Sequence, residues 1–304
     1  MKRYIIKRLL TSVVTIWVLI TLVFFMVRLI PGDPFTNGKI KPEIVENMME
    51  YYGLNKPLLE QYKVFVLNLL KGDLGYSLNY IGRTVNQIII DSFPVSADLG
   101  IRALIFAIIG GILLGVIAAI NHNKIWDNIS VTIAIVGISV PSFILGALIQ
   151  YIFALKFRWF PAAQWNSFSS TILPSFTLGI ATLGMITRIL RSSMIEIHNK
   201  NYLIVAKSKG LSKKHILFKY ELRNAIIPVI TLLGPTTAML LTGSFVVEQI
   251  FAIPGLGRHF VLSIQNLDYS LTLGLTIFYG TILILMNLIV DILYAIVDPR
   301  IRLE

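Results

Sequence analysis

The sequence predicts an all-α integral membrane protein with about six transmembrane helices. Hydrophobic residues make up 55% of its 304 residues and charged residues only 14%, whereas an average soluble domain is about one-quarter charged. So few charges cannot cover so much apolar surface in water. Apolar stretches of roughly 20 residues, the length that a membrane-spanning helix needs, recur along the whole chain. A lipid bilayer is therefore the expected solvent.

Six stretches meet this length requirement, and the first follows a basic N-terminus. The predicted spans are residues 9–30, 97–120, 130–155, 172–190, 225–247 and 271–297. The first span is longer than the apolar region of a secretory signal, which runs for about 7–15 residues and ends at a small-residue cleavage site. We therefore expect an uncleaved membrane anchor.

Lysine and arginine are distributed unevenly between the loops. Four lie before the first span, nine between residues 188 and 223, and two in the C-terminal tail. The long loop 31–96 carries six, which are balanced by seven acids. Because cytoplasmic loops are enriched in basic residues, both termini are expected to be cytoplasmic in a multi-pass protein of the cell membrane. The net charge of +11 then requires no nucleic-acid partner.

The loop between the first two spans is too long to be a simple connector. Residues 42–54 and 57–70 have helical character, with Gly53 as a break between them. We expect a small, mostly helical extracellular lobe.

The sequence shows no pattern of an enzyme site. Its single Gly-Lys pair, Gly38 and Lys39, lacks the glycine-rich turn and the Ser or Thr of a phosphate-binding loop. Cysteine is absent, and the four histidines form no His-Glu-x-x-His arrangement. We expect no catalytic, metal or cofactor site, so any uphill transport must draw its energy from a partner or an ion gradient.

The most informative segment is a basic stretch, residues 188–228, between two apolar spans. Residues 201–210 favour a helix in which Tyr202, Val205 and Ala206 share a face, and Gly210 follows where a helix end needs a left-handed residue. Ser212 is a suitable N-cap for a second helix over residues 213–222. An amphipathic helix that rests on anionic lipid explains these residues as well as a docking site for a partner does.

Several short motifs occur in a fixed order over the whole chain. They are residues 31–35, 52–57, 72–75, 138–143, 159–161, 162–171, 191–196, 201–211, 222–228, 243–257 and 298–302. Together they resemble ABC importer permeases of the oligopeptide, dipeptide and nickel group, and most of all the B-type membrane subunit of oligopeptide permeases. Within that resemblance, residues 201–211 are similar to the family's coupling loop. Ile204 and Val205 depart from the Glu-Ala-Ala of the wider importer pattern, so that only Ala206 and Gly210 carry over.

The resemblance implies a type I ABC importer transmembrane fold that forms half of a translocation pathway for oligopeptides. By similarity, residues 1–95 form the anchor and the extracellular lobe, residues 96–295 the permease domain with its coupling loop 191–224, and residues 296–304 a cytoplasmic tail. The implied ATPase-coupling residues are Tyr202, Ala206, Lys209, Gly210 and Leu211. The implied partners are two separate ATP-binding subunits, a homologous second permease and an extracellular peptide-binding protein, with lipid around the spans. Dipeptides or a nickel or metallophore complex are alternative cargoes. A stand-alone channel or gradient-driven carrier is the alternative from another class.

Prolines within the apolar stretches remove backbone donors and should bend their helices. Pro141 lies in the third predicted span, and Pro228 and Pro235 in the fifth. Because Pro228 and Pro235 follow the coupling-loop motif, we expect their bends to contribute to a gate.

Two acids lie at or inside predicted spans. Glu248 either lines the mouth of the translocation pathway or forms a structural hydrogen bond to the turn at Pro254 and Gly255. Asp291 lies inside the last span, where an unpaired charge is expensive. We expect it to pair with a basic residue such as Arg188 or Arg191, in preference to serving as a proton relay.

Overall fold

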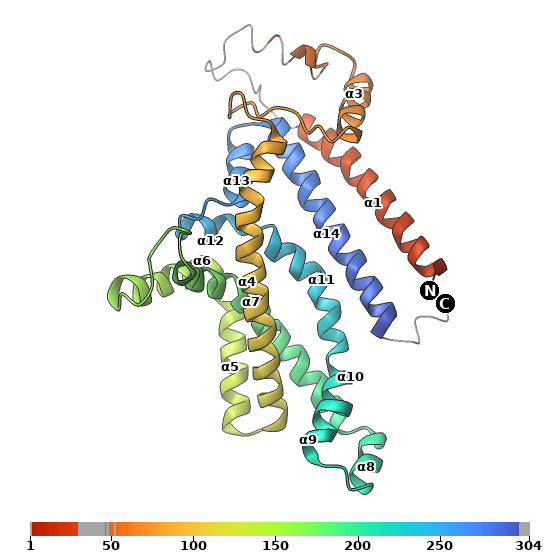
Figure 1. Ribbon diagram of the computed structural model, residues 1–304, viewed down its shortest axis with the longest axis vertical. Helices are drawn as coiled ribbons and strands as arrows, with labels where there is room; N and C mark the ends of the chain where they lie inside the picture. Colours follow the sequence, from red (N-terminus) through yellow and green to blue (C-terminus); the bar gives the residue numbers. More distant parts are fainter. Residues whose placement is uncertain (1, 30–45, 47–48, 52, 298–304) are drawn as a thin grey trace.

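The computed structural model describes residues 2–29, 46, 49–51 and 53–297. The motifs 31–35 and 298–302, most of the expected helix over 42–54 and nearly all of the expected tail lie outside these residues. The described part is built from helices and one isolated β-bridge, between Tyr76 and Thr84 (Figure 1).

The helices follow one another in a single order from the N-terminus. They are α1 (Lys2–Arg28), α3 (Leu58–Leu70), α4 (Val85–Ile120), α5 (Ile125–Ser139), α6 (Ser142–Ile149), the π-helix η1 (Gln150–Lys156), α7 (Phe168–His198), α8 (Asn201–Ser208), α9 (Lys213–Ile216), the π-helix η2 (Leu217–Leu222), α10 (Arg223–Ala225), α11 (Ile227–Leu241), α12 (Phe245–Ile250), α13 (Leu256–Gln265) and α14 (Tyr269–Val297).

Four of the described helices, α1, α4, α7 and α14, are each long and apolar enough to cross a membrane, and there are up to six spans if two bent pairs are counted. One bent pair corrects the third predicted span. The expected single helix 130–155 ends at Ser139, and the chain turns by 109° before it continues as Ser142–Lys156. Pro141 between the two helices has no N–H to continue the first of them.

The fifth predicted span also differs from the expectation. Its helix α11 begins at Ile227 and ends at Leu241, and Gly243 then turns the chain with a φ of +79° into α12. A left-handed φ of this kind favours glycine. The segment Lys213–Ala225 meets α11 at an angle of 49°.

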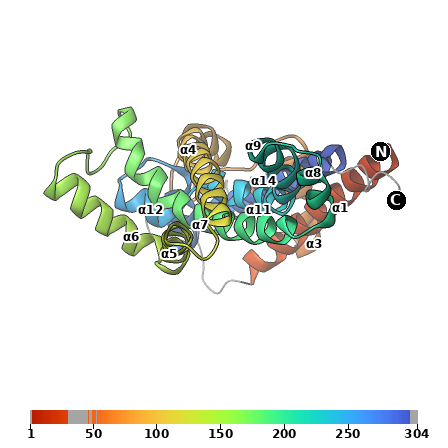
Figure 2. The same cartoon turned by 90° about the horizontal axis from the view of Figure 1, so that it is seen from below.

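Helix α7 is the centre of the fold, with α4, α5 and α11 packed around it (Figures 1 and 2). Close approach depends on glycine: a Cβ at Gly179 would lie 2.5 Å from the carbonyl oxygen of Ala103 in α4. Small residues let backbones approach in this way within membranes. Buried threonines of α7 satisfy their hydroxyls locally, since Thr187 donates to the carbonyl of Leu183 at 2.8 Å. Seen from below, α1 lies on one side of this core and α5 and α6 on the other (Figure 2).

Helix α1 packs along α14. At one end, Phe24 is buried against Tyr62 and Phe65 of α3. At the other end, Arg8 forms an ion pair of 3.0 Å with Asp291. The expectation that Asp291 pairs with Arg188 or Arg191 is therefore wrong. Its cation comes from the first helix, because α1 and not α7 lies beside α14 at that depth.

Candidate functional site

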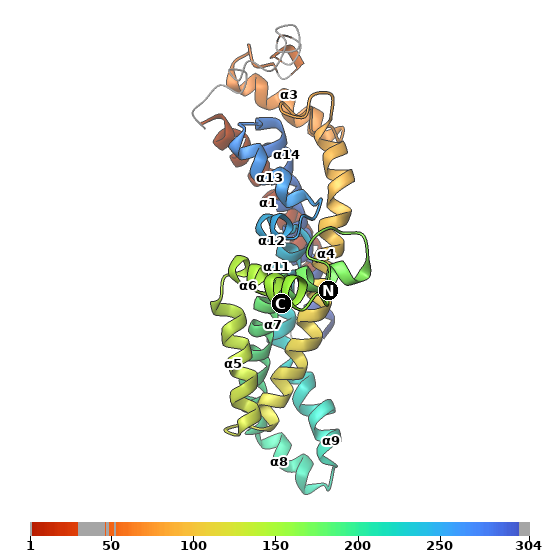
Figure 3. The same cartoon turned by 90° about the vertical axis from the view of Figure 1, so that its left-hand side faces the viewer.

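The basic segment folds into a helical hairpin, residues 201–222, at the end of the molecule opposite α3 (Figures 1 and 3). Helix α8 ends at Ser208, and Gly210 follows with a φ of +75°. The N–H of Gly210 donates a hydrogen bond to the carbonyl of Lys207 at 3.0 Å. Ser212 then caps α9 by accepting a hydrogen bond from the N–H of His215 at 3.4 Å. These are the Gly turn and the Ser cap that the sequence predicts.

The hairpin buries one apolar stripe and exposes another. Leu203, Ala206 and Ile216 pack together as its inner face. Tyr202 and Val205 point outward, with 42% and 54% of their surface exposed, so the expected shared face of Tyr202, Val205 and Ala206 is wrong. The apolar residues of α8 surround much of its circumference, and contacts with α7, α9 and η2 decide which of them are covered.

The remaining residues of the expected coupling site lie at the tip of the hairpin. Lys209 and Gly210 are exposed, and a Cβ added at Gly210 would meet no atom within 4 Å. Leu211 is half-buried against the inner face. The tip therefore has free space around it.

The root of the hairpin is tied by a polar cluster that the sequence analysis does not single out. Nδ1 of His198, at the end of α7, lies 2.8 Å from Oε1 of Glu221 in η2, and its Nε2 lies 3.4 Å from Nζ of Lys207. A lysine ammonium only donates hydrogen bonds. Nε2 therefore accepts from Lys207, and Nδ1–H donates to Glu221, which is nearly buried.

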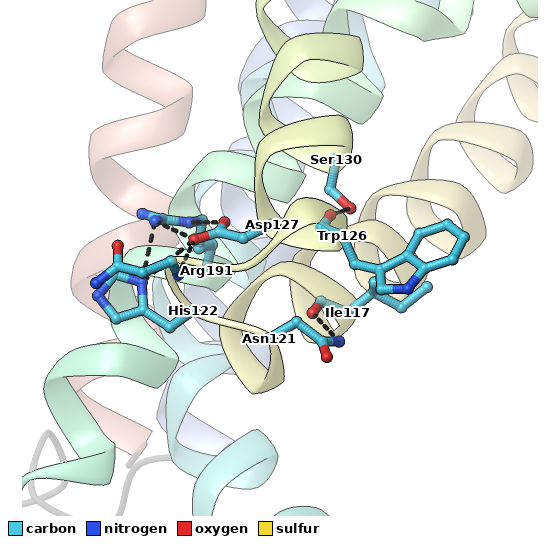
Figure 4. A network of polar contacts seen from close by, with 8 residues as sticks. Ile117, Asn121, His122, Trp126, Asp127, Ser130 and Arg191 are labelled. Atoms are coloured by element: carbon cyan, nitrogen blue, oxygen red, sulfur yellow. Dashed lines mark hydrogen bonds and ion pairs between the residues drawn. The ribbon is translucent and has the colours of Figure 1, made fainter.

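A second cluster joins α7 to the turn between α4 and α5 (Figure 4). Arg191 donates from Nε to Oδ1 of Asp127 at 2.6 Å and from Nη2 to Oδ2 at 2.8 Å. The backbone N–H of Asn123 donates to the same carboxylate at 2.9 Å, and His122 lies beside it. The sequence signal for this pair is weak. It consists of two charges of opposite sign that flank apolar spans and stand 64 residues apart.

Glu248 lies in α12 with its side chain fully buried. Ser96 of α4 donates to its Oε1 at 2.8 Å, and the N–H of Arg258 donates to its Oε2 at 3.3 Å, at the start of α13. Burial raises the pKa of this carboxyl to about 7, against the opposing effect of these hydrogen bonds. The Glu248 side chain thus has a structural role within this chain, although its donors are Ser96 and the first turn of α13 and not the turn at Pro254 and Gly255 that the sequence predicts. Its place at the mouth of the translocation pathway stays a prediction.

The two prolines expected to form a gate differ in their surroundings. Pro228 is the second residue of α11, next to the 49° bend between the hairpin arm and that helix. Pro235 lies inside α11, which continues through it to Leu241. The bend thus falls between the hairpin and the following helix.

A family model described as the binding-protein-dependent transport system inner membrane component matches residues 111–303. The chain belongs to this family. A second model, for the N-terminal part of such membrane components, matches residues 1–100. The chain is thus the membrane subunit of a binding-protein-dependent transport system.

Similar proteins extend over the full chain. The oligopeptide transport system permease protein OppB of Haemophilus influenzae is 46% identical over 99% of this chain and 100% of its own length. The dipeptide transport system permease protein DppB of Bacillus subtilis is 44% identical over 100% of this chain and 99% of its own. OppB of Escherichia coli is 42% identical over 99% of this chain.

A solved structure supports the same architecture. A chain of the MetNI methionine ABC transporter in an inward-facing conformation has a TM-score of 0.54 with this chain, which it matches over 69% of this chain and 96% of its own length. The two sequences are 15% identical, so this similarity concerns the fold alone. It bears out the ABC importer transmembrane fold expected from the motifs.

Proposed function

We propose that this permease forms half of the translocation pathway of an ATP-driven importer for oligopeptides. It carries no ATPase site of its own and is coupled to two separate ATP-binding subunits through residues 202–211. A homologous second permease completes the pathway. Both termini and the hairpin lie in the cytoplasm, and residues 31–96 face outward, where they receive a peptide-loaded binding protein.

The exposed apolar face of the hairpin supports ATPase docking. Tyr202, Ile204, Val205 and Phe218 are 42–63% exposed on a hairpin that projects beyond the long apolar helices. Exposed apolar side chains on a short helix are typical of a helix that lies in a groove of a partner. Because the hairpin is otherwise basic, an acidic rim around that groove would complement it.

The connections of the hairpin support a transmission role. Helix α7 runs without interruption into its root, and its return arm meets α11 at the bend beside Pro228. Movement of the hairpin would therefore act on two helices of the core at once. In the mechanism that we propose, closure of the ATPase subunits moves the hairpin and so alternates access to the pathway.

The names of the relatives support peptide cargo but do not decide between oligopeptides and dipeptides. OppB is named for oligopeptides and DppB for dipeptides. We assign oligopeptides, which agrees with the B-type motifs. Competition of labelled pentapeptide uptake by unlabelled dipeptides and pentapeptides separates the two. Stronger competition by dipeptides would move the assignment to dipeptides.

The docking proposal is tested by replacing Val205 with Asp. The charge would be desolvated in an apolar groove, which is costly, so V205D should recover far less ATPase when the permease is purified in mild detergent. Asn199→Asp is the matched control, since it adds the same charge at an exposed site outside the apolar face. Equal ATPase recovery with V205D and the control would refute docking through this face. Transport by the purified chain alone without ATP would instead favour a carrier.

A further inference from the structure

A cavity of about 820 Å³ lies between the hairpin and the adjacent ends of α4 and α7. Its volume is in the range of small-molecule binding sites. The exposed apolar residues of the hairpin, Tyr202, Ile204, Val205 and Phe218, do not line this cavity, although Leu211 of the coupling segment does. Its lining comes from the end of α4, the end of α7 and the hairpin that follows α7.

The cavity has an apolar wall and a cationic rim. Ala119 and Ile120 of α4 and Met194 of α7 form part of the wall, while Lys207, Lys213 and Lys214 supply three ammonium groups. The single acid among the lining residues is Glu221, which already accepts from His198. Within the described residues, no acid forms an ion pair with Lys213 or Lys214. In the part of the chain that the structure describes, the positive charge of Lys213 and Lys214 on the rim is therefore not neutralised by an ion pair.

The position of the cavity limits the type of anion. Figures 1 and 3 both show α9 level with the α4–α5 turn, where two apolar helices end, and α8 further out. The end of such helices is where the hydrocarbon core of a bilayer meets its headgroups. A ligand here has apolar side chains on one side and lysines on the other. This is the arrangement in which basic pockets between transmembrane helices bind lipid headgroups.

We propose that this cavity binds the phosphate headgroup of one anionic phospholipid. Lys213 and Lys214 contact the phosphate, Lys207 contributes from the opposite arm of the hairpin, and an acyl chain lies along Ala119 and Ile120. A bound lipid would join the end of α4 to both arms of the hairpin and so hold the hairpin in place. This lipid site requires only that the chain is a membrane subunit, and it does not depend on which cargo is transported.

The first test is native mass spectrometry of the assembled transporter after extraction from nanodiscs of phosphatidylglycerol or phosphatidylcholine. We expect one phosphatidylglycerol per permease to survive delipidation, with no retained phosphatidylcholine. Because this comparison uses the unaltered protein, it stands even if a variant does not assemble. Equal retention of both lipids, or of neither, would overturn the proposal.

The second test compares K213Q/K214Q with K219Q. Each lysine near anionic lipid contributes about 1 kcal/mol, and 1.4 kcal/mol corresponds to tenfold, so the double variant should bind phosphatidylglycerol roughly 30-fold more weakly. Lys219 is exposed on the same hairpin but does not line the cavity, so K219Q should retain the lipid. Equal loss in both would indicate general surface charge and overturn the site.

Two further outcomes identify other occupants. Inorganic phosphate could displace phosphatidylglycerol and bind with the same dependence on Lys213 and Lys214. If the transporter then retains no phosphatidylglycerol at ordinary phosphate concentrations, the site takes a free anion. If the isolated permease retains the lipid and the assembled transporter does not, the ATPase covers the cavity. Either result would contradict a lipid site in the working transporter.

Discussion

Arg191 holds the carboxylate of Asp127 with two donors, at 2.6 Å and 2.8 Å, and only 2% of the Asp127 side chain is exposed. The pair joins the start of α5 to α7 about two turns before His198 at the hairpin root. Removal of one partner from a buried ion pair leaves a charge without compensation.

Arg191→Ala should therefore be strongly destabilising. We expect a loss of about 3 kcal/mol in the free energy of unfolding, measured by denaturation of the detergent-solubilised permease. Glu196→Ala is the control: it removes an ion pair to Lys200 of 2.9 Å whose carboxylate is 73% exposed, and such surface pairs contribute less than about 1 kcal/mol. Similar losses in the two variants would contradict a structural role for Asp127.

Gly255→Ala should disrupt the junction of α4, α12 and α13. A Cβ at Gly255 would lie 2.5 Å from Cδ of Glu248 and 2.5 Å from Oγ of Ser96. Because both side chains are buried and hydrogen-bonded to each other, overpacking should cost about 3 kcal/mol. Gly72→Ala provides the comparison, since Gly72 has a φ of +78° but open space around it and should cost about 1 kcal/mol. A smaller loss for G255A than for G72A in the same denaturation assay would refute tight packing there.

Stability should depend on pH through Glu248, whose helix α12 is not among the long apolar spans. Burial raises its pKa from 4.5 to about 7, so the folded state holds a proton that the unfolded state releases. The contribution of protonated Glu248 to the free energy of unfolding is fully present below pH 4.5. It is lost as the pH rises through 7, by about 3 kcal/mol in total. Melting of wild type and E248Q between pH 5 and pH 8 tests this. The wild type should lose stability with rising pH relative to E248Q, and parallel curves would contradict the shift.

Gly210→Val should separate ATP hydrolysis from uptake. Its φ of +75° is strained for a β-branched residue, although no atom blocks the side chain. The strain should distort the hairpin tip and leave the core folded. Peptide uptake per ATP hydrolysed in proteoliposomes should fall, while membrane insertion stays normal. Gly82→Val introduces the same strain in the loop between α3 and α4, at a φ of +81° in open space, and should leave this ratio unchanged. An unchanged ratio in G210V would exclude a coupling role for the tip.

The sequence is sufficient to predict the class of fold and the helical hairpin. Apolar length is a local property, so a span is predicted within each of α1, α4, α7 and α14. The ends are less accurate, since α4 begins at Val85 and not at residue 97, and α7 continues to His198. The Gly turn and Ser cap at Gly210 and Ser212 are equally local, because φ preference and side-chain capping act within a few residues.

What the sequence misses depends on contacts between distant segments. The partner of Asp291 is Arg8, and no local pattern distinguishes it from Arg191, which pairs instead with Asp127. The 109° turn at Pro141 is a similar case. Proline removes one donor, but the packing of α6 against α7 and α12 determines where the chain continues.

The unbroken length of α7 has a mechanical consequence. Its 31 residues extend for about 46 Å at 1.5 Å per residue. A rigid helix of this length would act as a lever in the coupling mechanism that we propose. For a rod of that length, a tilt of about 5° about one end shifts the other end by about 4 Å. A small tilt of α7 at the hairpin would thus become, at Phe168, a movement comparable to the width of a side chain.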